Sequence, residues 1–376
     1  MMFKKIKYYF LEFKSEFKML NSGIKYVFSQ KERAIYVGCI GVGNLGDEAV
    51  FEAIKNLLKT KIHIYKTTYY KPSSGRRFRK YFFKQPNYII LGGGTLIMKK
   101  ANESFLRIFK NFHKQYPSAK LIVMGTGVAD TVLAQQNGFP TDIASWSMIL
   151  NECEFISVRG KLSRDTLGSS KFNIHKEIKI LHDPALYFLR DNLKLKKKQK
   201  KIGLNFCDIL GRIYGQNPYL VEKIFKELVE LLLKENWTIY LYPTAATDIV
   251  YMKKILGKEI ITRLNIYKNY RNLKESLLFF DNVDIFVEQR LHSIIFSANT
   301  YTPFYAIEYE SKMSDFLSSI GIKNASTRTD MLNLNNIKRT IDDLYLNVHQ
   351  EQKKLYSICN KARFEQLECV NEFLNK

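Results

Sequence analysis

The 376-residue sequence has few cysteines, few acidic residues and no long apolar run. Its five cysteines are scattered without a C-x-x-C pair, which argues against a disulfide framework or a zinc site and for reduced thiols in the cytoplasm. No apolar run reaches about 18 residues, so no membrane span is predicted. Lys and Arg total 59 against 36 Asp and Glu, a formal net charge of +23. We therefore expect anionic partners, such as phosphorylated ligands, acidic glycans, anionic lipid or nucleic acid.

The N-terminal segment, residues 1–29, is basic and amphipathic. Its first twenty residues, MMFKKIKYYFLEFKSEFKML, place apolar side chains at helical spacing among lysines. Glu12 and Glu16 interrupt the apolar stripe and no small-residue cleavage site follows, so the segment is not a signal peptide. Two interpretations stay open: a helix lying on anionic lipid, or a helix packed on the protein's own surface.

Deletion of residues 1–29 separates these two interpretations. If the segment binds membrane, the shortened chain stays folded and loses most of its affinity for anionic vesicles, because apolar insertion and the nearby lysines are removed together. Vesicle sedimentation and a thermal melt measure the two properties. Unfolding of the shortened chain, or vesicle binding equal to that of the full chain, contradicts the membrane interpretation.

The rest of the chain shows two successive α/β patterns. Short apolar runs alternate with helical stretches and several runs end in glycine, which is typical of parallel sheets. The predicted strands are Ala34–Ile40, Lys61–Tyr65, Tyr88–Leu91, Lys120–Met124, Phe155–Val158, Lys179–Leu181, Lys201–Phe206, Trp237–Leu241, Asp284–Glu288 and Pro303–Ile307. The clearest helices in the second pattern are Pro218–Leu233 and Leu291–Ala298.

These patterns predict an α/β protein of two Rossmann-like domains that face a central cleft. The N-terminal domain covers residues 30–190 and the C-terminal domain residues 202–333. Between them, residues 191–201 include NLKLKKKQKK, which has six lysines and no acid; this composition indicates a linker, although a solvated loop would look the same. Residues 334–376 predict C-terminal helices. In such folds ligands bind at the carboxyl ends of the strands.

The loop GVGNLG, residues 41–46, has the spacing G-x-G-x-x-G between a strand and a helix. A dinucleotide site also needs an acidic residue about 20 positions further on, and residues 60–83 contain none. Asp47 and Glu48 would moreover face the cofactor's pyrophosphate at the helix start. We therefore do not expect NAD or NADP to bind. The structural alternative is that the glycines only turn the chain, with Asp47 favouring the helix N-terminus.

Six motifs follow one another in a characteristic order. They are GVGNLGDEA (41–49), LGGGTL (91–96), MGTGV (124–128), SVRGKLS (157–163), HDPAL (182–186) and RLH (290–292), the last followed by TPFYAIEYESK, which ends in Lys312. Each motif is unspecific alone, but together they resemble the polysaccharide pyruvyl transferase family over residues 36–325. One departure is Gly160, where the family commonly has an acidic residue.

This resemblance implies a GT-B-like enzyme that transfers the pyruvyl group of phosphoenolpyruvate to two hydroxyls of a sugar. The product is a cyclic ketal and phosphate is released. The donor carries a phosphate and a carboxylate, which arginine binds well, and the chemistry needs a general acid and a general base. Neither a cofactor nor a metal is expected. The implied acceptor is a lipid-linked saccharide of surface polysaccharide synthesis, handled in the cytoplasm at the inner face of the membrane.

The RLH motif supplies the candidate donor site. Arg290 and His292 follow a predicted strand at a helix start, where backbone amides favour phosphate. By the resemblance, Arg290 clamps the donor phosphate or carboxylate, and His292 protonates the donor or the departing phosphate. The structural alternatives are a salt bridge between Arg290 and Glu288 and a hydrogen-bonded core histidine. Lys312 would add positive charge, or be an ordinary exposed lysine.

The first domain supplies the candidate acceptor side. Asp47 is the candidate base, and Asn44 would orient the sugar; the alternative for Asp47 is a helix-start role. Gly93 and Gly94 would let backbone amides approach the substrate. Arg159 would form a second anion clamp, or be a surface arginine.

The last candidate is His182, which together with Asp183 would line the cleft or cap a turn. Residues 66–84 interleave basic and aromatic side chains, a composition that nucleic-acid sites share, but no nucleic-acid module supports that partner and lipid headgroups suit the resemblance better. Two other functions stay open: a nucleotide-sugar glycosyltransferase of the same architecture, and a non-catalytic glycan- or lipid-binding protein.

Overall fold

The computed structural model describes residues 24–26, 28–41, 43–66, 85–98, 105–138, 140–209 and 213–375. The predicted helix within residues 1–23 and the basic stretch from residue 67 to 84 lie outside the described residues. Within the described ranges, no helix is both long and apolar enough to cross a membrane.

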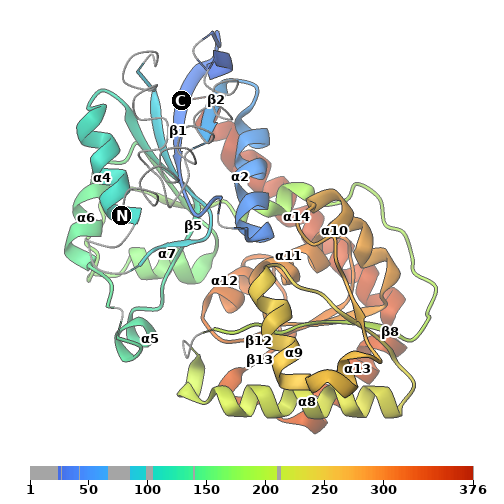
Figure 1. Ribbon diagram of the computed structural model, residues 1–376. Coiled ribbons are helices and arrows are strands. Elements are labelled where there is room, and N and C mark those ends of the chain that lie inside the picture. Colours follow the sequence, from blue (N-terminus) through green and yellow to red (C-terminus); the bar gives the residue numbers. More distant parts are fainter. Residues whose placement is uncertain are drawn as a thin grey trace, which may run out of the picture.

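The first domain is built on a parallel sheet with the strand order β2-β1-β3-β5-β6-β7, in which β4 pairs with β5. The strands are β1 (Glu32–Val37), β2 (Ile62–Lys66), β3 (Tyr88–Gly92), β4 (Thr95–Ile97), β5 (Lys120–Val128), β6 (Phe155–Val158) and β7 (Ile178–Ile180). Side chains of β1 alternate between two cores, because both faces of a parallel sheet are covered. Helices α4 (Phe105–Gln115) and α6 (Ile143–Asn151) cover one face, and α2 (Leu45–Leu58) the other (Figure 1).

The second domain contains another parallel sheet, ordered β10-β9-β8-β11-β12-β13. This is the strand order of a doubly wound nucleotide-binding fold, 3-2-1-4-5-6. The strands are β8 (Lys201–Asn205), β9 (Thr238–Leu241), β10 (Asn265–Ile266), β11 (Ile285–Glu288), β12 (Phe304–Glu308) and β13 (Ser326–Arg328). The helices are α8 (Pro218–Lys234), α9 (Ala246–Ile261), α10 (Leu273–Phe279), α11 (Leu291–Asn299), α12 (Lys312–Ser319) and α13 (Leu334–Leu346).

The α/β class and the two Rossmann-like sheets are therefore confirmed, with three corrections to the strands. The strand predicted at Ala34–Ile40 ends at Val37, because the chain bends from Gly38 onward. The short strands β4, β10 and β13 were not predicted, since two or three residues carry no periodic signal. Strand β5 continues to Val128, through glycines that mimic a strand end.

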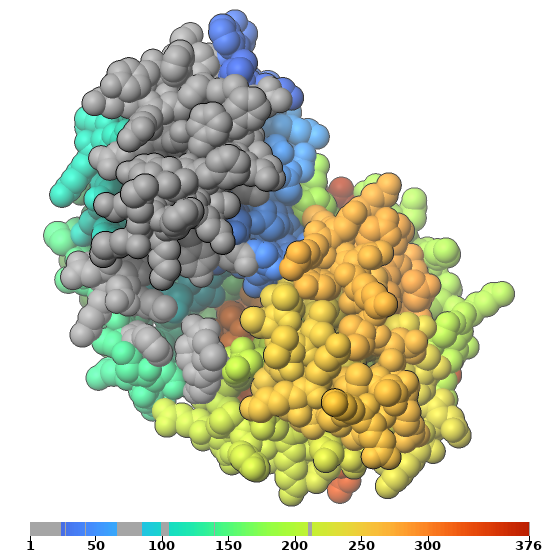
Figure 2. All heavy atoms as spheres, in the orientation of Figure 1, coloured from blue at the N-terminus to red at the C-terminus, as the bar shows by residue number. Residues whose placement is uncertain are grey.

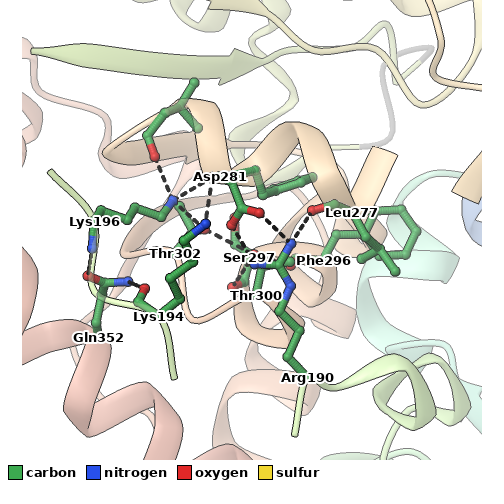
Figure 3. A network of polar contacts seen from close by, with 12 residues as sticks. Arg190, Lys194, Lys196, Leu277, Asp281, Phe296, Ser297, Thr300, Thr302 and Gln352 are labelled. Atoms are coloured by element: carbon green, nitrogen blue, oxygen red, sulfur yellow. Dashed lines mark hydrogen bonds and ion pairs between the residues drawn. The ribbon is translucent and has the colours of Figure 1, made fainter. Parts of the chain in front are cut away.

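The lysine-rich segment packs against the second domain rather than standing in solvent along its whole length. The ammonium of Lys196 donates to the Val283 carbonyl at 2.5 Å and to Thr302 Oγ1 at 2.7 Å. Gln352 accepts from Lys196 N and donates to the Lys194 carbonyl, and Figure 3 shows these contacts together. Burial lowers the pKa of Lys196 to about 7. Composition alone does not reveal this, because five other lysines surround it.

The helical C-terminal tail is confirmed, and its long helix α14 (Val348–Leu374) contacts both domains. Phe373 packs against Tyr88 and Phe155 of the first sheet, with ring centroids 5.8 and 5.1 Å apart. The C-terminal end of α14 therefore lies beside the first domain, as Figure 1 shows. Residues 24–26 also belong to this domain: Tyr26 is fully buried against His63 and Tyr65. A truncation at residue 23 is thus a cleaner test of the N-terminal segment.

We predict that Phe373→Ala lowers the free energy of unfolding by about 3 kcal/mol, because a buried ring is replaced by a cavity. Phe364→Ala is the matched control, since Phe364 lies on the same helix with 62% of its surface exposed. Denaturant unfolding measures both variants. Equal stabilities of the two variants would show that α14 does not brace the first domain.

Candidate active site

The candidate residues lie at element ends on both sides of the domain interface. The first turn of α2 docks on the second domain: Leu45 N donates to the Thr244 carbonyl at 3.0 Å. In the next residue, a Cβ added to Gly46 would lie 2.0 Å from Nδ1 of His292, so only glycine lets the imidazole ring lie against this helix. Figure 2 shows the blue α2 region of the first domain meeting the yellow and orange second domain.

The start of α2 holds two of the predicted residues. Asn44 is the N-cap, and its Oδ1 accepts a hydrogen bond from Gly46 N at 2.9 Å. Asp47 follows in the first turn, near Gly94, where an added Cβ would lie 3.9 Å from Asp47 Oδ1. Burial raises the pKa of Asp47 to about 7, although a hydrogen bond from Cys39 and the charges of Lys312 and Arg290 oppose the shift. Asp47 thus titrates near neutral pH.

The glycines after β3 bring the sheet close to α2. Gly93 has a φ of +67°, and an added Cβ would lie 1.8 Å from Val50 Cγ1 of α2. Its neighbour Gly94 accepts a hydrogen bond from Gly127 N at 2.7 Å, which holds the loop against β5. These glycines therefore let the loop pack closely on α2, while the approach of the Gly93 and Gly94 amides to a substrate stays a prediction.

Arg290 is fixed by an acidic residue that the sequence did not single out. Its Nε and Nη2 donate to Asp248 Oδ1 at 3.2 and 2.5 Å, and its backbone N donates to Asn205 Oδ1 at 2.8 Å. The alternative of a salt bridge with Glu288 is wrong. Glu288 instead accepts hydrogen bonds from Ser293 and from Ser297, beneath α11, and burial raises its pKa to about 8.

His292 is nearly buried, with 9% of its surface exposed. Among the described residues its Nε2 has no hydrogen-bond partner, so it differs from the hydrogen-bonded core histidine of the alternative interpretation. Burial lowers the pKa of His292 to about 3, and the charges of Arg159, Lys312 and Arg290 add to this effect. The imidazole is therefore neutral at pH 7 and lies near three cations.

Arg159 is fully buried at the domain interface, so the alternative of a surface arginine is wrong. Its Nη2 donates to Thr95 Oγ1 at 3.2 Å. Asp183 Oδ2 lies 3.9 Å from Nη1, and Asp315 Oδ2 of the second domain lies 3.6 Å from Nε. These distances are too long for hydrogen bonds, and within the described chain Nε and Nη1 have no hydrogen-bond partner. Nε and Nη1 of Arg159 thus form ion pairs with two carboxylates without a hydrogen bond to either.

Lys312 is mostly buried rather than an ordinary exposed lysine. Its ammonium lies 3.6 Å from Glu310 Oε2 and 4.4 Å from the centroid of the Tyr309 ring. Burial works to lower the pKa of Lys312, but Glu310 and Tyr309 raise it above its ordinary value. Lys312 also lines a cavity of about 40 Å³ between the domains, together with Thr95, Met98, Ala129, Leu133 and other residues.

His182 contacts the C-terminal helix, while its neighbour Asp183 faces Arg159. Its Nε2 is 2.9 Å from Glu365 Oε2 of α14, and its Nδ1 is 3.3 Å from Ser319 Oγ. Only 2% of its surface is exposed, and its backbone has a φ of +62°. Both ring nitrogens therefore contact protein groups that brace the two domains.

Reasoning from the sequence missed Asp248 and Asp315, which contact Arg290 and Arg159 from other elements. The one available signal for Asp248 is an acidic residue in the first turn of a helix, which many helices share. Within the described residues, no group of three or more His, Cys, Asp or Glu could hold a metal ion.

Comparison with solved structures identifies the architecture. The chain is similar to an alpha-glucosyltransferase solved with UDP and a 13-mer DNA, with 10% identity over 91% of this chain and 100% of that one and a TM-score of 0.52. It is also similar to the S. aureus MnaA–UDP structure, with 12% identity, coverages of 92% and 95% and a TM-score of 0.54. For a putative UDP-N-acetylglucosamine 2-epimerase from Listeria monocytogenes, the identity is 10%, the coverages are 92% and 95%, and the TM-score is 0.56. At these identities the likeness concerns the fold alone, that of two-domain GT-B-like proteins.

The family follows from the sequence itself. A model of the polysaccharide pyruvyl transferase family matches residues 44–311, a range that includes the first turn of α2 and the RLH motif. The chain belongs to the polysaccharide pyruvyl transferase family. A search of curated proteins finds no significant match.

We predict that the imidazole of His292 stays neutral as the pH falls from 8 to about 4.5, because its pKa in the folded protein lies well below the ordinary value of about 6.5. Histidine ring resonances in NMR spectra measure this, with His292→Gln to assign the signal and the exposed His175 as a reference in the same spectra. A His292 signal that titrates near pH 6.5 would contradict the buried, cation-flanked environment.

Proposed function

We propose that this protein transfers the pyruvyl group of phosphoenolpyruvate onto two hydroxyls of a sugar in a lipid-linked saccharide. The product is a pyruvate ketal, and phosphate is released. The observation that carries this proposal is the buried, neutral His292 among Arg159, Arg290 and Lys312. Three cationic side chains, each of them also beside a carboxylate, and an unpartnered imidazole nitrogen suit a donor with two anionic groups.

Three cations share the donor in this proposal. Arg290 binds the phosphate or the carboxylate, with the N-terminus of α11 adding favourable amide dipoles. Arg159 offers Nε and Nη1, which make no hydrogen bond to Asp183 or Asp315, to the other anionic group, and Lys312 adds charge without a fork geometry. Lys312 also lines the small cavity at the domain interface, which Arg159, Arg290 and His292 do not line.

The chemistry requires two hydroxyl additions at one carbon. In the first, a sugar hydroxyl attacks C2 of the donor while C3 takes up a proton; in the second, a neighbouring hydroxyl displaces phosphate from C2. His292 is the acid of this scheme. Its pKa of about 3 describes the site without donor, and anionic groups beside the ring raise a histidine pKa, so the donor itself would help to load the proton.

Asp47 is the proposed base on the acceptor side. Its pKa of about 7 means that a large fraction is ionised at neutral pH, which fits proton removal from a hydroxyl. Asn44, Gly93 and Gly94 lie at the same end of the first domain and would contact the sugar. We assign the reaction to the cytoplasm, with the enzyme peripheral on the inner, anionic face of the membrane; the chain's net charge of +23 supports that partner.

Calorimetric titration tests the donor first. We expect phosphoenolpyruvate to bind, and nucleotide sugars, NADH and NADPH not to bind.

Arg290→Ala abolishes donor binding and Arg290→Lys restores it only in part, because the planar fork is lost. His292→Asn lowers turnover by about 100-fold or more while donor binding changes less. Arg263→Ala and His349→Asn, at exposed positions of the second domain and the C-terminal helix, are matched controls.

Each alternative function has its own signature in this experiment. Binding of a nucleotide sugar without phosphoenolpyruvate indicates a glycosyltransferase, and glycan or vesicle binding without any donor indicates a non-catalytic protein. Wild-type donor affinity in a folded Arg290→Ala variant removes the clamp assignment. Normal turnover of His292→Asn makes that histidine structural.

A further inference from the structure

Asp248, near the start of α9, is a fully buried carboxylate whose two oxygens serve different elements. Oδ1 accepts both hydrogen bonds from the guanidinium of Arg290. Oδ2 accepts from Thr244 N at 3.0 Å, from Ala245 N at 3.1 Å and from Thr244 Oγ1 at 3.2 Å. Both oxygens of Asp248 therefore accept hydrogen bonds, as a buried carboxylate must because an unpaired one is costly.

The loop that Asp248 holds is also the surface on which the first domain docks. The Thr244 carbonyl accepts the hydrogen bond from Leu45 N of α2. A continuous chain of contacts therefore runs from Arg290 through Asp248 and Thr244 to Leu45, and Asp47 follows two residues later. The candidate donor clamp and the candidate base are joined across the interface through one side chain.

We propose that Asp248 is a positioning residue. It fixes the guanidinium of Arg290 for the donor anion, and it holds the Thr244 loop on which the first turn of α2 docks. This inference rests on the proposed function. A flexible arginine would lose side-chain freedom on binding the donor, whereas a guanidinium already held at two nitrogens has lost that freedom beforehand. The charge of Asp248 also compensates that of Arg290 while the site is empty.

Asp248→Asn is the informative change because it keeps the shape of the side chain but cannot accept hydrogen bonds both from Arg290 and from the Thr244–Ala245 loop. An amide has one acceptor oxygen, and its NH2 group only donates. If the oxygen faces Arg290, the NH2 group meets the donors of Thr244 and Ala245; if it is flipped, the NH2 group meets the guanidinium. Either orientation breaks one half of the arrangement seen in the structure.

We expect Asp248→Asn to weaken phosphoenolpyruvate binding by about tenfold, as measured by calorimetry on the full chain. The matched control is Asp281→Asn, which disrupts another Asp–Arg pair, the contact of Asp281 with Arg190 seen in Figure 3. That control should keep the wild-type donor affinity, even if it lowers the melting temperature. A purely structural role of Asp248 would likewise change the melting temperature without changing donor affinity.

A double-mutant cycle tests whether the effect passes through Arg290. In an Arg290→Lys background, Asp248→Asn should weaken donor binding by less than about twofold, because a lysine has no fork for the carboxylate to orient. Equal losses in both backgrounds, or wild-type affinity in Asp248→Asn itself, overturn the inference. Should Asp248→Asn fail to fold, Asp248→Glu replaces it, since it keeps the charge but moves the oxygens by one methylene, with the same expectations.

The outcomes for this inference and for the proposed function are distinguishable. If wild-type protein does not bind phosphoenolpyruvate, the proposed function falls and the role of Asp248 falls with it. If wild type binds and only the Asp248 variants behave like wild type, the proposed function stands and the positioning role alone is wrong.

Discussion

The docking of the first turn of α2 against the second domain is the contact on which the rest of the candidate site depends. The hydrogen bond from Leu45 N to the Thr244 carbonyl fixes the register, and Gly46 leaves room for the ring of His292. This one contact withdraws His292 from water and brings Asp47 toward the cations of the second domain. Neither domain alone supplies both sets of groups, so the candidate site lies at the interface.

The electrostatics of the site follow from that burial. Three cations and little water keep His292 uncharged, while the same lack of water raises the pKa of Asp47 to about 7 and that of Asp183 to about 6. Each of the three cations also lies beside a carboxylate, and Nε and Nη1 of Arg159 make no hydrogen bond to the carboxylates they face. The hydrogen bonds that remain unmade at Arg159 and at Nε2 of His292 are what the proposed donor would complete.

Much of the fold was predictable because its signals are local. Apolar runs marked most of the strands, several of them ending in glycine, and β6 was placed with its observed bounds. The lysine-rich segment was harder: six lysines look alike in sequence, but only the neighbouring carbonyls and Thr302 make Lys196 a buried anchor. His182 likewise precedes a proline at a predicted strand end, and nothing nearby indicates that Glu365 from the last helix would bind it.

The sequence by itself determined the α/β class, the two sheets and the family, since periodicity, glycine-bounded strands and ordered motifs all act within short windows. It also named Arg290, His292 and Asp47 as candidates. The tertiary structure alone decided what surrounds them: that Asp248 rather than Glu288 pairs with Arg290, and that the imidazole of His292 is neutral. Asp248 and Arg290 are 42 positions apart, and His292 is buried between two domains, so both features depend on how separate elements pack. A local sequence pattern does not reveal which distant charges will meet or which side chains will be withdrawn from water.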